Sequence, residues 1–298
     1  MTTVPAAASA HRPAVSALRH FLRAPSALIG LGLLALLVIG AVFAPQIAPQ
    51  NPFDLAAIDV LDARLPPGSA SMGTDITYLL GTDGQGRDLF SAILYGLRTS
   101  LTVGVGSALL AGLIGILLGL IAAWSGGFID ALIMRLVDLI MSLPSILVAL
   151  LMLALLGRGI GNVVLTLVLL EWAYYARTAR AQALVERKRD YFEAARGLGL
   201  PTSRILLRHV LPNCLPPLLV IAALQVARAI TLEATLSFLG VGVPVTQPSL
   251  GLLIANGFEF LLSGEYWIAV FPGIALVLLI MSLNLVGDRL RRSFNVRA

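Results

Sequence analysis

The sequence contains six long apolar runs, each close to the length that a helix needs to cross a lipid bilayer. Such a helix needs about 20 mostly apolar residues. We therefore expect an all-α integral membrane protein with six transmembrane helices, at approximately Ala27–Ala44, Ser100–Trp124, Leu132–Leu156, Ile160–Ala176, Asn213–Glu233 and Trp267–Val286.

The composition also indicates a membrane protein. Charged residues make up only 12% of the 298 residues, against about a quarter in an average soluble domain. The net charge of +5 comes almost wholly from arginine, because Lys188 is the only lysine. No aromatic-basic motif accompanies this charge, so we expect membrane lipid and no nucleic acid as a partner. Cys214, the only cysteine, excludes an internal disulfide and a cysteine-based metal cluster.

A basic leader containing Arg12, Arg19 and Arg23 precedes the first run, an order that resembles a signal peptide. The run has about 18 residues, however, which exceeds the roughly 7–15 residues of a signal core. Pro45 follows it directly. We therefore expect this run to be retained as a membrane helix.

The arginines between the runs predict the orientation in the membrane. The loop Pro45–Arg98 contains six aspartates and three arginines, which favours the outer side. Nearly all other basic residues lie in the leader, the turn Ser125–Asp130 with the nearby Arg135, the loop Arg177–Pro212 and the tail Asp288–Ala298. Because positively charged loops stay in the cytoplasm, we expect both termini there.

Small residues and prolines within the runs predict close packing and bends. Gly115 and Gly119 form a GxxxG pair, which allows two helix backbones to approach closely; a chance match in a glycine-rich helix is the alternative. Pro144, Pro216 and Pro217 lie in or at the starts of other runs, where we expect kinks.

A polar, basic segment, Asp190–Asn213, separates the fourth run from the fifth. Its first part predicts a helix of about two turns over Tyr191–Leu198, with Asp190 as N-cap and Glu193 completing a capping box. Its second part predicts another short helix, over Thr202–Val210, between two prolines.

The predicted second helix has two faces. Ile205, Leu206 and His209 share one face, and Arg204 and Arg208 lie on another.

Two short helices across the inner face of a membrane could bind lipid headgroups. Ala194 and Ala195, however, leave a small-residue surface beside Glu193 that suits close docking against a partner protein.

This segment carries a specific resemblance. EAARGLG followed by HVLPN is similar to the EAA loop of binding-protein-dependent ABC importer permeases. The residues in register are Glu193, Ala194, Ala195, Gly199, Leu211 and Pro212, and Arg208 and His209 match the peptide and nickel importer subgroup.

Other segments resemble the C-type permease subunit of that subgroup, in the same order and spacing. They are Leu80–Leu101, Asp130 with Met134–Pro144, Leu236–Gly242, Pro248–Gly251, Phe271–Gly273 and Asn284–Asp288. Three departures weaken any inference about the substrate: Leu250 stands where the subgroup commonly has tryptophan, the chain ends in SFNVRA, and Gly68–Leu79 is longer than expected.

The resemblance implies the type I ABC importer permease fold, with six transmembrane helices and a cytoplasmic EAA coupling loop at residues 182–212. The EAA residues, with Arg208 and His209, would contact the ATPases. The implied partners are a second homologous permease subunit, two cytoplasmic ABC ATPase subunits and a periplasmic or lipid-anchored substrate-binding protein. The expected organisation is a cytoplasmic leader at 1–25, a first helix and periplasmic loop at 26–98, a five-helix core at 99–287 and a cytoplasmic tail at 288–298.

Motifs for ATP hydrolysis are missing from the chain. It has no GxxxxGK[ST] motif, and TDGQGRD lacks the lysine and the hydroxyl residue that hold phosphate and magnesium. HExxH and GxSxG are also missing. We therefore expect a non-catalytic subunit without a cofactor of its own, ATP and Mg bound by partner subunits, and a turn-rich outer loop at TDGQGRD.

Charged residues within the predicted spans are candidates for the substrate path. Glu171 lies in the fourth span, and Arg228 and Glu233 lie in the fifth. Intramembrane charges are costly and often functional, although an internal structural pair is the alternative. Arg228 and Glu233 are separated by about 140° around a helix, so we do not expect them to pair.

Two other classes of protein fit less well. A secondary transporter predicts an inverted repeat and a cluster of ion-coupling carboxylates, but no clear repeat is present and only Glu171 lies deep. A membrane enzyme needs a nucleophile and base or a ligand cluster, and His11, His20 and His209 all fall on the predicted cytoplasmic side.

The favoured function is therefore a permease subunit of an ATP-driven importer for peptides or similar small solutes in the bacterial cytoplasmic membrane. The loops Pro45–Arg98 and Val241–Tyr266 are candidates for contacting the binding protein. A dipeptide, a longer peptide, glutathione, a nickel chelate and an opine-like compound all remain open as cargo, because specificity largely resides in that protein.

Overall fold

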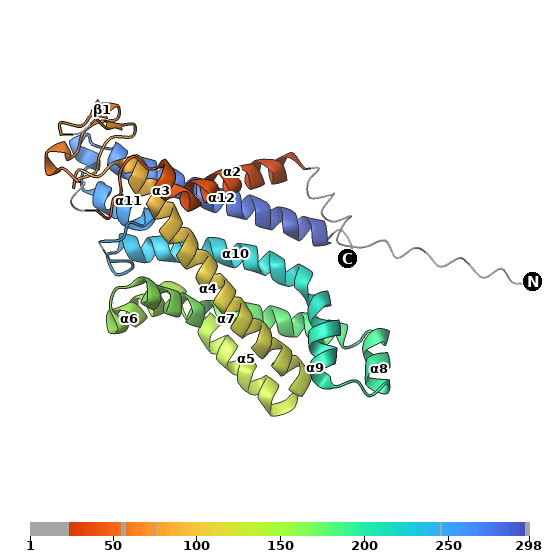
Figure 1. Cartoon of the computed structure of the whole chain (residues 1–298). Helices are drawn as coiled ribbons and strands as arrows, with labels where there is room; N and C mark the ends of the chain where they lie inside the picture. The colour runs from red at the N-terminus through yellow and green to blue at the C-terminus, as the bar shows by residue number, and fades with distance from the viewer. Residues whose placement is uncertain (1–23, 55–57, 74, 245, 296–298) are drawn as a thin grey trace, which may run out of the picture.

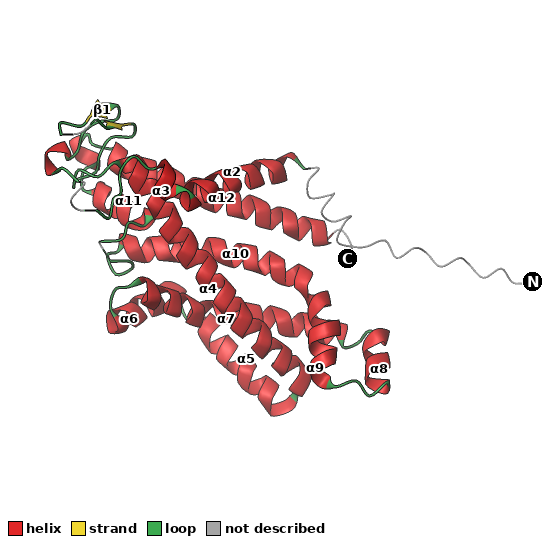
Figure 2. Ribbon diagram, in the orientation of Figure 1, coloured by secondary structure: helices red, strands yellow, loops and turns green. Residues whose placement is uncertain are grey.

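The protein is almost entirely helical, as Figure 2 shows. The computed structural model describes residues 24–54, 58–73, 75–244 and 246–295, so the predicted leader lies outside the described residues except for positions 24 and 25. The long helices are α2 (Pro25–Val42), α4 (Leu89–Ser125), α5 (Gly127–Ser142), α6 (Ser145–Leu156), α7 (Ile160–Glu186), α10 (Leu211–Phe238) and α12 (Trp267–Asn295).

Short elements connect these helices. The strands β1 and β2 pair antiparallel, with Ser69 opposite Tyr78. The short elements are α3 (Ala44–Ile47), η2 (Val60–Asp62), β1 (Ser69–Ala70), β2 (Thr77–Tyr78), α8 (Asp190–Gly197), α9 (Thr202–Arg204), the π-helix η3 (Ile205–Val210), α11 (Leu250–Phe258) and η4 (Leu261–Ser263).

Within the described residues, four helices are long and apolar enough to cross a membrane: α2, α4, α12 and the continuous helix Thr202–Phe238. A fifth span results if α5 and α6 count as one bent span. Helix α7 has 27 residues but carries Glu171 and Arg177 and is not among these spans. The structure confirms a multi-span helical protein, whereas the count of six spans stays a prediction.

The two ends of the molecule carry different elements (Figure 1). The start of α2, the end of α12 and the short helices α8 and α9 lie toward one end. The β1 strand and α11 lie at the other end. The segments expected in the cytoplasm and those expected outside it therefore lie at opposite ends.

Helices α4 and α7 pack tightly along the GxxxG pair. A Cβ atom at Gly115 would overlap the carbonyl oxygen of Trp172, and one at Gly119 would overlap that of Ala176. Only glycine allows this approach of the two backbones. The predicted close packing is confirmed, and the partner is α7 of the same chain.

The third predicted span is broken rather than continuous. The sequence predicts one helix over Leu132–Leu156, but α5 ends at Ser142, and α6 leaves it at 93°. Leu143 has φ −90° and ψ 141°, the extended conformation that a following proline favours. Pro144 therefore turns the chain where only a kink was expected.

Helix α4 begins at Leu89 rather than at the predicted Ser100. Asp88 caps it, because its carboxylate accepts hydrogen bonds from the backbone N–H of Ser91 at 2.8 Å and from the Ser91 hydroxyl at 2.5 Å. At the other end, Gly126 has φ 60° and α5 starts at the next residue. The turn expected at Ser125–Asp130 is thus much shorter.

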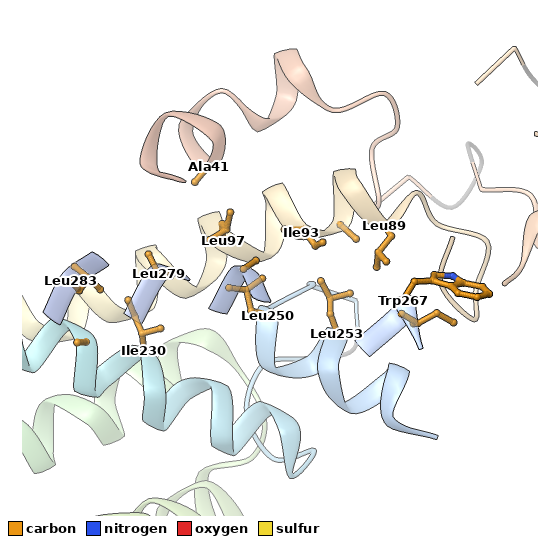
Figure 3. Packing of buried hydrophobic residues seen from close by; sticks show 14 residues of the cluster. Ala41, Leu89, Ile93, Leu97, Ile230, Leu250, Leu253, Trp267, Leu279 and Leu283 are labelled. Atoms are coloured by element: carbon orange, nitrogen blue, oxygen red, sulfur yellow. The ribbon is translucent and has the colours of Figure 1, made fainter. Parts of the chain in front are cut away.

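A large apolar cluster lies where α4, α10, α11 and α12 meet (Figure 3). Leu97, Ile230 and Leu279 are buried in it. Trp267, at the start of α12, belongs to the same cluster, and its indole nitrogen donates to the carbonyl oxygen of Thr82 at 3.3 Å. This cluster fixes the loop before α4 onto the helix bundle.

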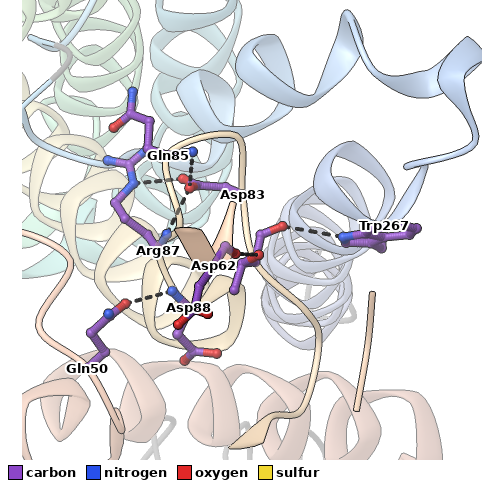
Figure 4. Close-up of polar contacts among 8 residues, drawn as sticks. Gln50, Asp62, Asp83, Gln85, Arg87, Asp88 and Trp267 are labelled. Carbon is purple, nitrogen blue, oxygen red and sulfur yellow. Dashed lines mark hydrogen bonds and ion pairs between the residues drawn. The ribbon is translucent and has the colours of Figure 1, made fainter. Parts of the chain in front are cut away.

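The TDGQGRD segment forms turns, as predicted, and its charged side chains are buried. Figure 4 shows their polar contacts. Asp83 accepts hydrogen bonds from the backbone N–H of Gln85 at 2.8 Å and from Nε of Arg87 at 2.7 Å. Gln50 accepts from the backbone N–H of Asp88 at 2.7 Å. These contacts tie the segment to the chain that follows α3.

Asp62 holds together the rest of this loop. Its carboxylate accepts hydrogen bonds from the Ser71 hydroxyl at 2.5 Å, the Met72 backbone N–H at 2.9 Å and the Tyr78 hydroxyl at 2.8 Å. Burial alone would raise the pKa of Asp62, but the hydrogen bonds outweigh it, so the pKa lies below its ordinary value of 3.8. The ionised carboxylate therefore stabilises the loop.

Candidate functional site

Helix α8 contains the EAA residues. Asp190 is the first residue of the helix, and the N-cap is Arg189, with no side-chain capping hydrogen bond. The predicted capping box with Asp190 as N-cap is therefore wrong, because Arg189 is the extended residue that precedes the helix. Asp190 and Glu193 instead lie in the first turn, where the helix dipole favours acidic groups.

One face of α8 is buried against the ends of α4 and α7. Phe192 and Ala195 are buried there. The Phe192 ring packs edge-on against Trp124, with ring centroids 6.1 Å apart. The guanidinium of Arg187 lies 5.9 Å from the centroid of each ring and donates to the carbonyl oxygen of Ala123. These contacts fix α8 to the long helices, and we call the buried cluster that they belong to the α8 seat.

The opposite face of α8 is exposed. Glu193 and Ala194 point outward, and Leu198 is 78% exposed just beyond the helix. Of the two alanines predicted to form a small-residue surface, only Ala194 does so, since Ala195 faces the seat. Gly199 has φ +66°, a left-handed conformation that suits glycine at the turn after the helix.

The second predicted short helix does not end at Pro212. Helix α9, the π-helix η3 and α10 follow one another without a break, as one helix over Thr202–Phe238. Pro212 is tolerated because it lies in the first turn of α10, beside the wider π-helix. The Asn213 side chain donates to the carbonyl oxygen of His209 at 2.7 Å. Any force on α9 therefore acts directly on α10.

The remaining predicted coupling residues differ in exposure. Arg208 and Pro212 are exposed, and His209 and Leu211 are half-buried. Arg204 is exposed as well, and Ile205 and Val210 are buried in the seat, so the two predicted faces of this segment are present.

Tyr191 links α8 to two long helices. Its hydroxyl donates to the Glu186 carboxylate of α7 at 2.6 Å and accepts from the Asn213 amide of α10 at 3.4 Å. Burial, together with the Glu186 carboxylate, raises the pKa of Tyr191 to about 12. The tyrosine therefore stays protonated and keeps this link at physiological pH.

Glu233, one of the three candidates for the substrate path, is a buried structural contact. Its carboxylate accepts hydrogen bonds from the hydroxyls of Ser100 at 2.8 Å and Ser237 at 2.7 Å. It thereby joins α10 to α4. Among the described residues it forms no ion pair with Arg228, which agrees with the helical spacing.

The structure brings Glu171 and Arg228 into one region. Glu171 is 1% exposed, and neither of its carboxylate oxygens has a hydrogen-bond partner in the described part of the chain. Arg228 is close enough to attract it electrostatically. The Arg228 guanidinium also lies 4.4 Å from the Tyr174 ring centroid and donates to the Ser145 hydroxyl at 3.2 Å. Unlike Glu233, whose carboxylate is held by two serine hydroxyls, Glu171 and Arg228 therefore remain candidates for the substrate path.

Sequence reasoning missed two ion pairs between α5 and α7. Asp130 pairs with Arg180, and Asp138 pairs with Arg177. The sequence did contain one indication of these ion pairs, because Asp138 is a charged residue inside the predicted span Leu132–Leu156.

The two loops predicted to contact a binding protein meet at the end opposite α8. They line a cavity of about 480 Å³ between the TDGQGRD segment and the ends of α10 and α11. Its polar lining includes Gln85, Asn256 and Glu259. Within the described residues, no group of three or more histidine, cysteine or acidic side chains is placed to hold a metal ion.

Two family models match the chain. One, described as binding-protein-dependent transport system inner membrane component, covers residues 115–298. The other, the N-terminal TM domain of oligopeptide transport permease C, covers residues 13–67. Together they span both the helical core with α8 and the region of the first helix.

Full-length relatives agree with these matches. A putative peptide transport system permease protein of Brucella suis biovar 1 (strain 1330) is 42% identical over 279 residues, which cover 94% of this chain and 90% of that protein. The di/tripeptide transport system permease protein DppC of Pseudomonas aeruginosa (strain UCBPP-PA14) is 39% identical over 273 residues, which cover 92% of this chain and 88% of that protein.

A solved structure shares the fold. It is a chain of the MetNI methionine ABC transporter in an inward-facing conformation, with a TM-score of 0.54 and 20% identity, covering 68% of this chain and 96% of that chain. The helical bundle, the family models and the relatives together show that this chain is a multi-pass membrane permease of the binding-protein-dependent transport system inner membrane component family.

Proposed function

We propose that this protein is the membrane-spanning subunit of an ATP-binding-cassette importer that moves peptides or similar small solutes into the cytoplasm. Family membership supports the importer class. The names of the relatives, a peptide permease and a di/tripeptide permease, support the class of solute. The observation that carries the coupling role is the exposed Glu193 and Ala194 surface on a helix fixed by its opposite face.

The surface has the properties that docking to a separate ATPase requires. Ala194 permits close approach, and the Glu193 carboxylate offers one charge that fixes the register of the contact. Phe192 holds α8 to α4 and α7, so a push on α8 moves these helices as well. The push reaches the helix Thr202–Phe238 through the packing of α8 on Ile205 and Val210 and through the Tyr191–Asn213 contact, and because that helix is continuous it acts on α10. Closure of an ATPase dimer would in this way tilt the spans.

The residues that take part in this coupling extend beyond α8. We propose that the ATPase contact comprises Glu193, Ala194 and Arg208 as exposed groups, and that Ala195, Gly199, His209, Leu211 and Pro212 shape and support it.

The other parts of the complex follow from the same proposal. ATP and Mg would be bound by two partner ATPases, and this chain would act without a cofactor or catalysis of its own. A second homologous permease would complete the route for the solute. Both termini and α8 would face the cytoplasm, and the cavity between the outer loops would face a periplasmic or lipid-anchored binding protein.

The coupling proposal is tested by purifying the tagged complex in mild detergent and measuring how much ATPase is retained. In Glu193→Arg, charge reversal at the exposed surface is expected to release the ATPases while the second permease remains bound. Asp288→Arg is the matched control, because Asp288 is an exposed acidic residue near the end of α12. It should retain the ATPases. Equal retention in wild type and Glu193→Arg would exclude Glu193 from the contact.

A further inference from the structure

The Asp138–Arg177 ion pair lies open to its surroundings, and both residues lie far from the ends of α5 and α7 that adjoin α8. The side chains of Asp138 and Arg177 are 63% and 47% exposed. At 1.5 Å per residue, Asp138 lies about 16 Å from the first residue of α5, and Arg177 lies about 14 Å from the last residue of α7. Asp138 is also one turn, about 6 Å, from Ser142, where α5 ends at the break before α6, so the pair lies near the middle of the bent span and not at its α8 end.

The pair belongs to a polar strip along α5. Arg135, Asp138 and Ser142 are all exposed, and with 3.6 residues per turn they fall within about 60° of one another around the helix. An adjoining exposed face is made of leucines, of which Leu136 lies farthest from the strip, about 100° from Arg135. Leu136 is 48% exposed, and Leu132, Leu139 and Leu143 lie between it and the strip.

The strip continues onto the neighbouring helices. On α7, Tyr174 is half-buried and Ala181 is exposed, and they share a face with Arg177. Tyr174 stacks with Arg228 of α10, and Arg228 donates to Ser145 of α6. We call the six residues of this surface the polar face: Arg135, Asp138, Ser142, Tyr174, Arg177 and Arg228.

Lipid is a poor environment for the polar face. Charged side chains within membrane spans face the bundle interior or water, because hydrocarbon solvates them badly. A dry contact with another protein would have to supply a carboxylate for Arg135, since Arg135 forms no ion pair among the residues that the structure describes and a buried unpaired charge is strongly destabilising. Water is the environment that satisfies all of these groups.

We propose that the polar face lines a water-filled route through the membrane, and that the Asp138–Arg177 pair opens to bind the two charged ends of a zwitterionic solute as it passes. The solute's ammonium group would bind Asp138, and its carboxylate would bind Arg177. An exposed ion pair is weak in water, so separating it costs little. The proposal rests on the importer function and specifies a chemical class, solutes with both ends charged.

Thiol accessibility tests the water-filled route in the assembled complex. Cys214 is buried and is first replaced by alanine. Ser142→Cys and Ala181→Cys then place thiols along the strip, and Leu136→Cys places one on the leucine face of α5. A charged, membrane-impermeant thiol reagent should label the first two at least about tenfold faster than the third, because the reactive thiolate forms in water.

Two results would overturn the route. The first is that Ser142→Cys and Ala181→Cys react no faster than Leu136→Cys. The second is that they react in the isolated chain but not in the complex, which would make the polar face a dry contact with the second permease. A complex that still transports solute while showing either result would leave the importer function standing.

Uptake by the reconstituted complex tests the pair itself, using dipeptides with free or blocked ends. Asp138→Asn should lower uptake of the free dipeptide about tenfold relative to wild type while leaving uptake of its N-acetylated form nearly unchanged. Arg177→Gln should do the same for the free and the C-amidated forms. Each variant is compared with wild type on the same peptide, so any preference of the binding protein for free or blocked peptides does not change the ratio of the two uptake rates. Equal losses for free and blocked peptides would show a structural ion pair instead.

Discussion

At the scale of single residues, the surroundings of each charge decide its role. Glu233 has two serine hydroxyls as partners and joins two helices. Glu171 is equally buried but lacks hydrogen-bond partners in the described part of the chain, which is costly unless a change of conformation or a solute supplies them. We propose Glu171 and Arg228 as residues of the substrate path, and Glu233 as a residue that supports it.

Neutral variants test these roles. Glu171→Gln and Arg228→Gln should assemble normally with the partners, and solute uptake should fall about tenfold if each contributes one charge-dependent contact during transport. Assembly is followed by co-purification and uptake by reconstitution. If both variants transport at the wild-type rate, neither residue lies on the path.

The acidic pH limit of the outer loop should depend on Asp62. Its folded-state pKa lies below 3.8, so its stabilising contribution is fully present above about pH 4 and is lost as the pH falls through the folded-state pKa. Asp62→Asn should destabilise the loop at pH 7 by about 1–3 kcal/mol and should remove part of this acid dependence. Hydrogen exchange of loop amides, corrected for intrinsic rates, measures both effects. Unchanged protection in Asp62→Asn at pH 7 would contradict the role of the carboxylate.

At the scale of elements, the contact between α4 and α7 shows how backbone geometry positions α8, the proposed coupling element. Gly115 and Gly119 let the two helices touch, and α8 is seated on the ends of the same two helices. The packing of this pair therefore determines where α8 lies.

Adding one methyl group tests that packing. Gly115→Ala and Gly119→Ala should each lower the free energy of unfolding by about 1–3 kcal/mol, because the new Cβ meets backbone carbonyls that cannot move aside easily. Gly106→Ala is the matched control in the same helix, where a Cβ would meet nothing within 4 Å. It should be neutral or slightly stabilising, since alanine favours helix. Thermal unfolding in detergent would contradict this view if all three variants behaved alike.

Local signals predicted some elements well and others poorly. The glycine spacing predicted a backbone contact correctly, because such a contact depends only on residue size. The rule that proline interrupts a helix holds at Pro144, where the span breaks, but not at Pro212, which lies within a continuous helix. The difference comes from the adjoining π-helix and from the packing around it, which residue patterns do not encode. Asp138 was missed because apolar neighbours dominate its run.

At the scale of the whole molecule, the positions of the α8 surface and of the cavity between the outer loops support the proposal that force is transmitted across the membrane. The α8 surface and the cavity between the outer loops lie at opposite ends, joined by α4 and by the helix Thr202–Phe238. Short sequence motifs pointed to the segments at both ends, because each segment is local in the sequence. The way in which α4 and the helix Thr202–Phe238 join the two ends could be seen only in the three-dimensional structure.

Solute uptake into liposomes tests the importer role most directly. This chain is reconstituted alone, or together with its permease partner, both ATPases and the binding protein. Uptake should occur only with the complete set and ATP, because this chain contains no ATP-binding motif. Accumulation of solute by this chain alone, driven by an ion gradient without ATP, would contradict the importer role and identify a secondary transporter.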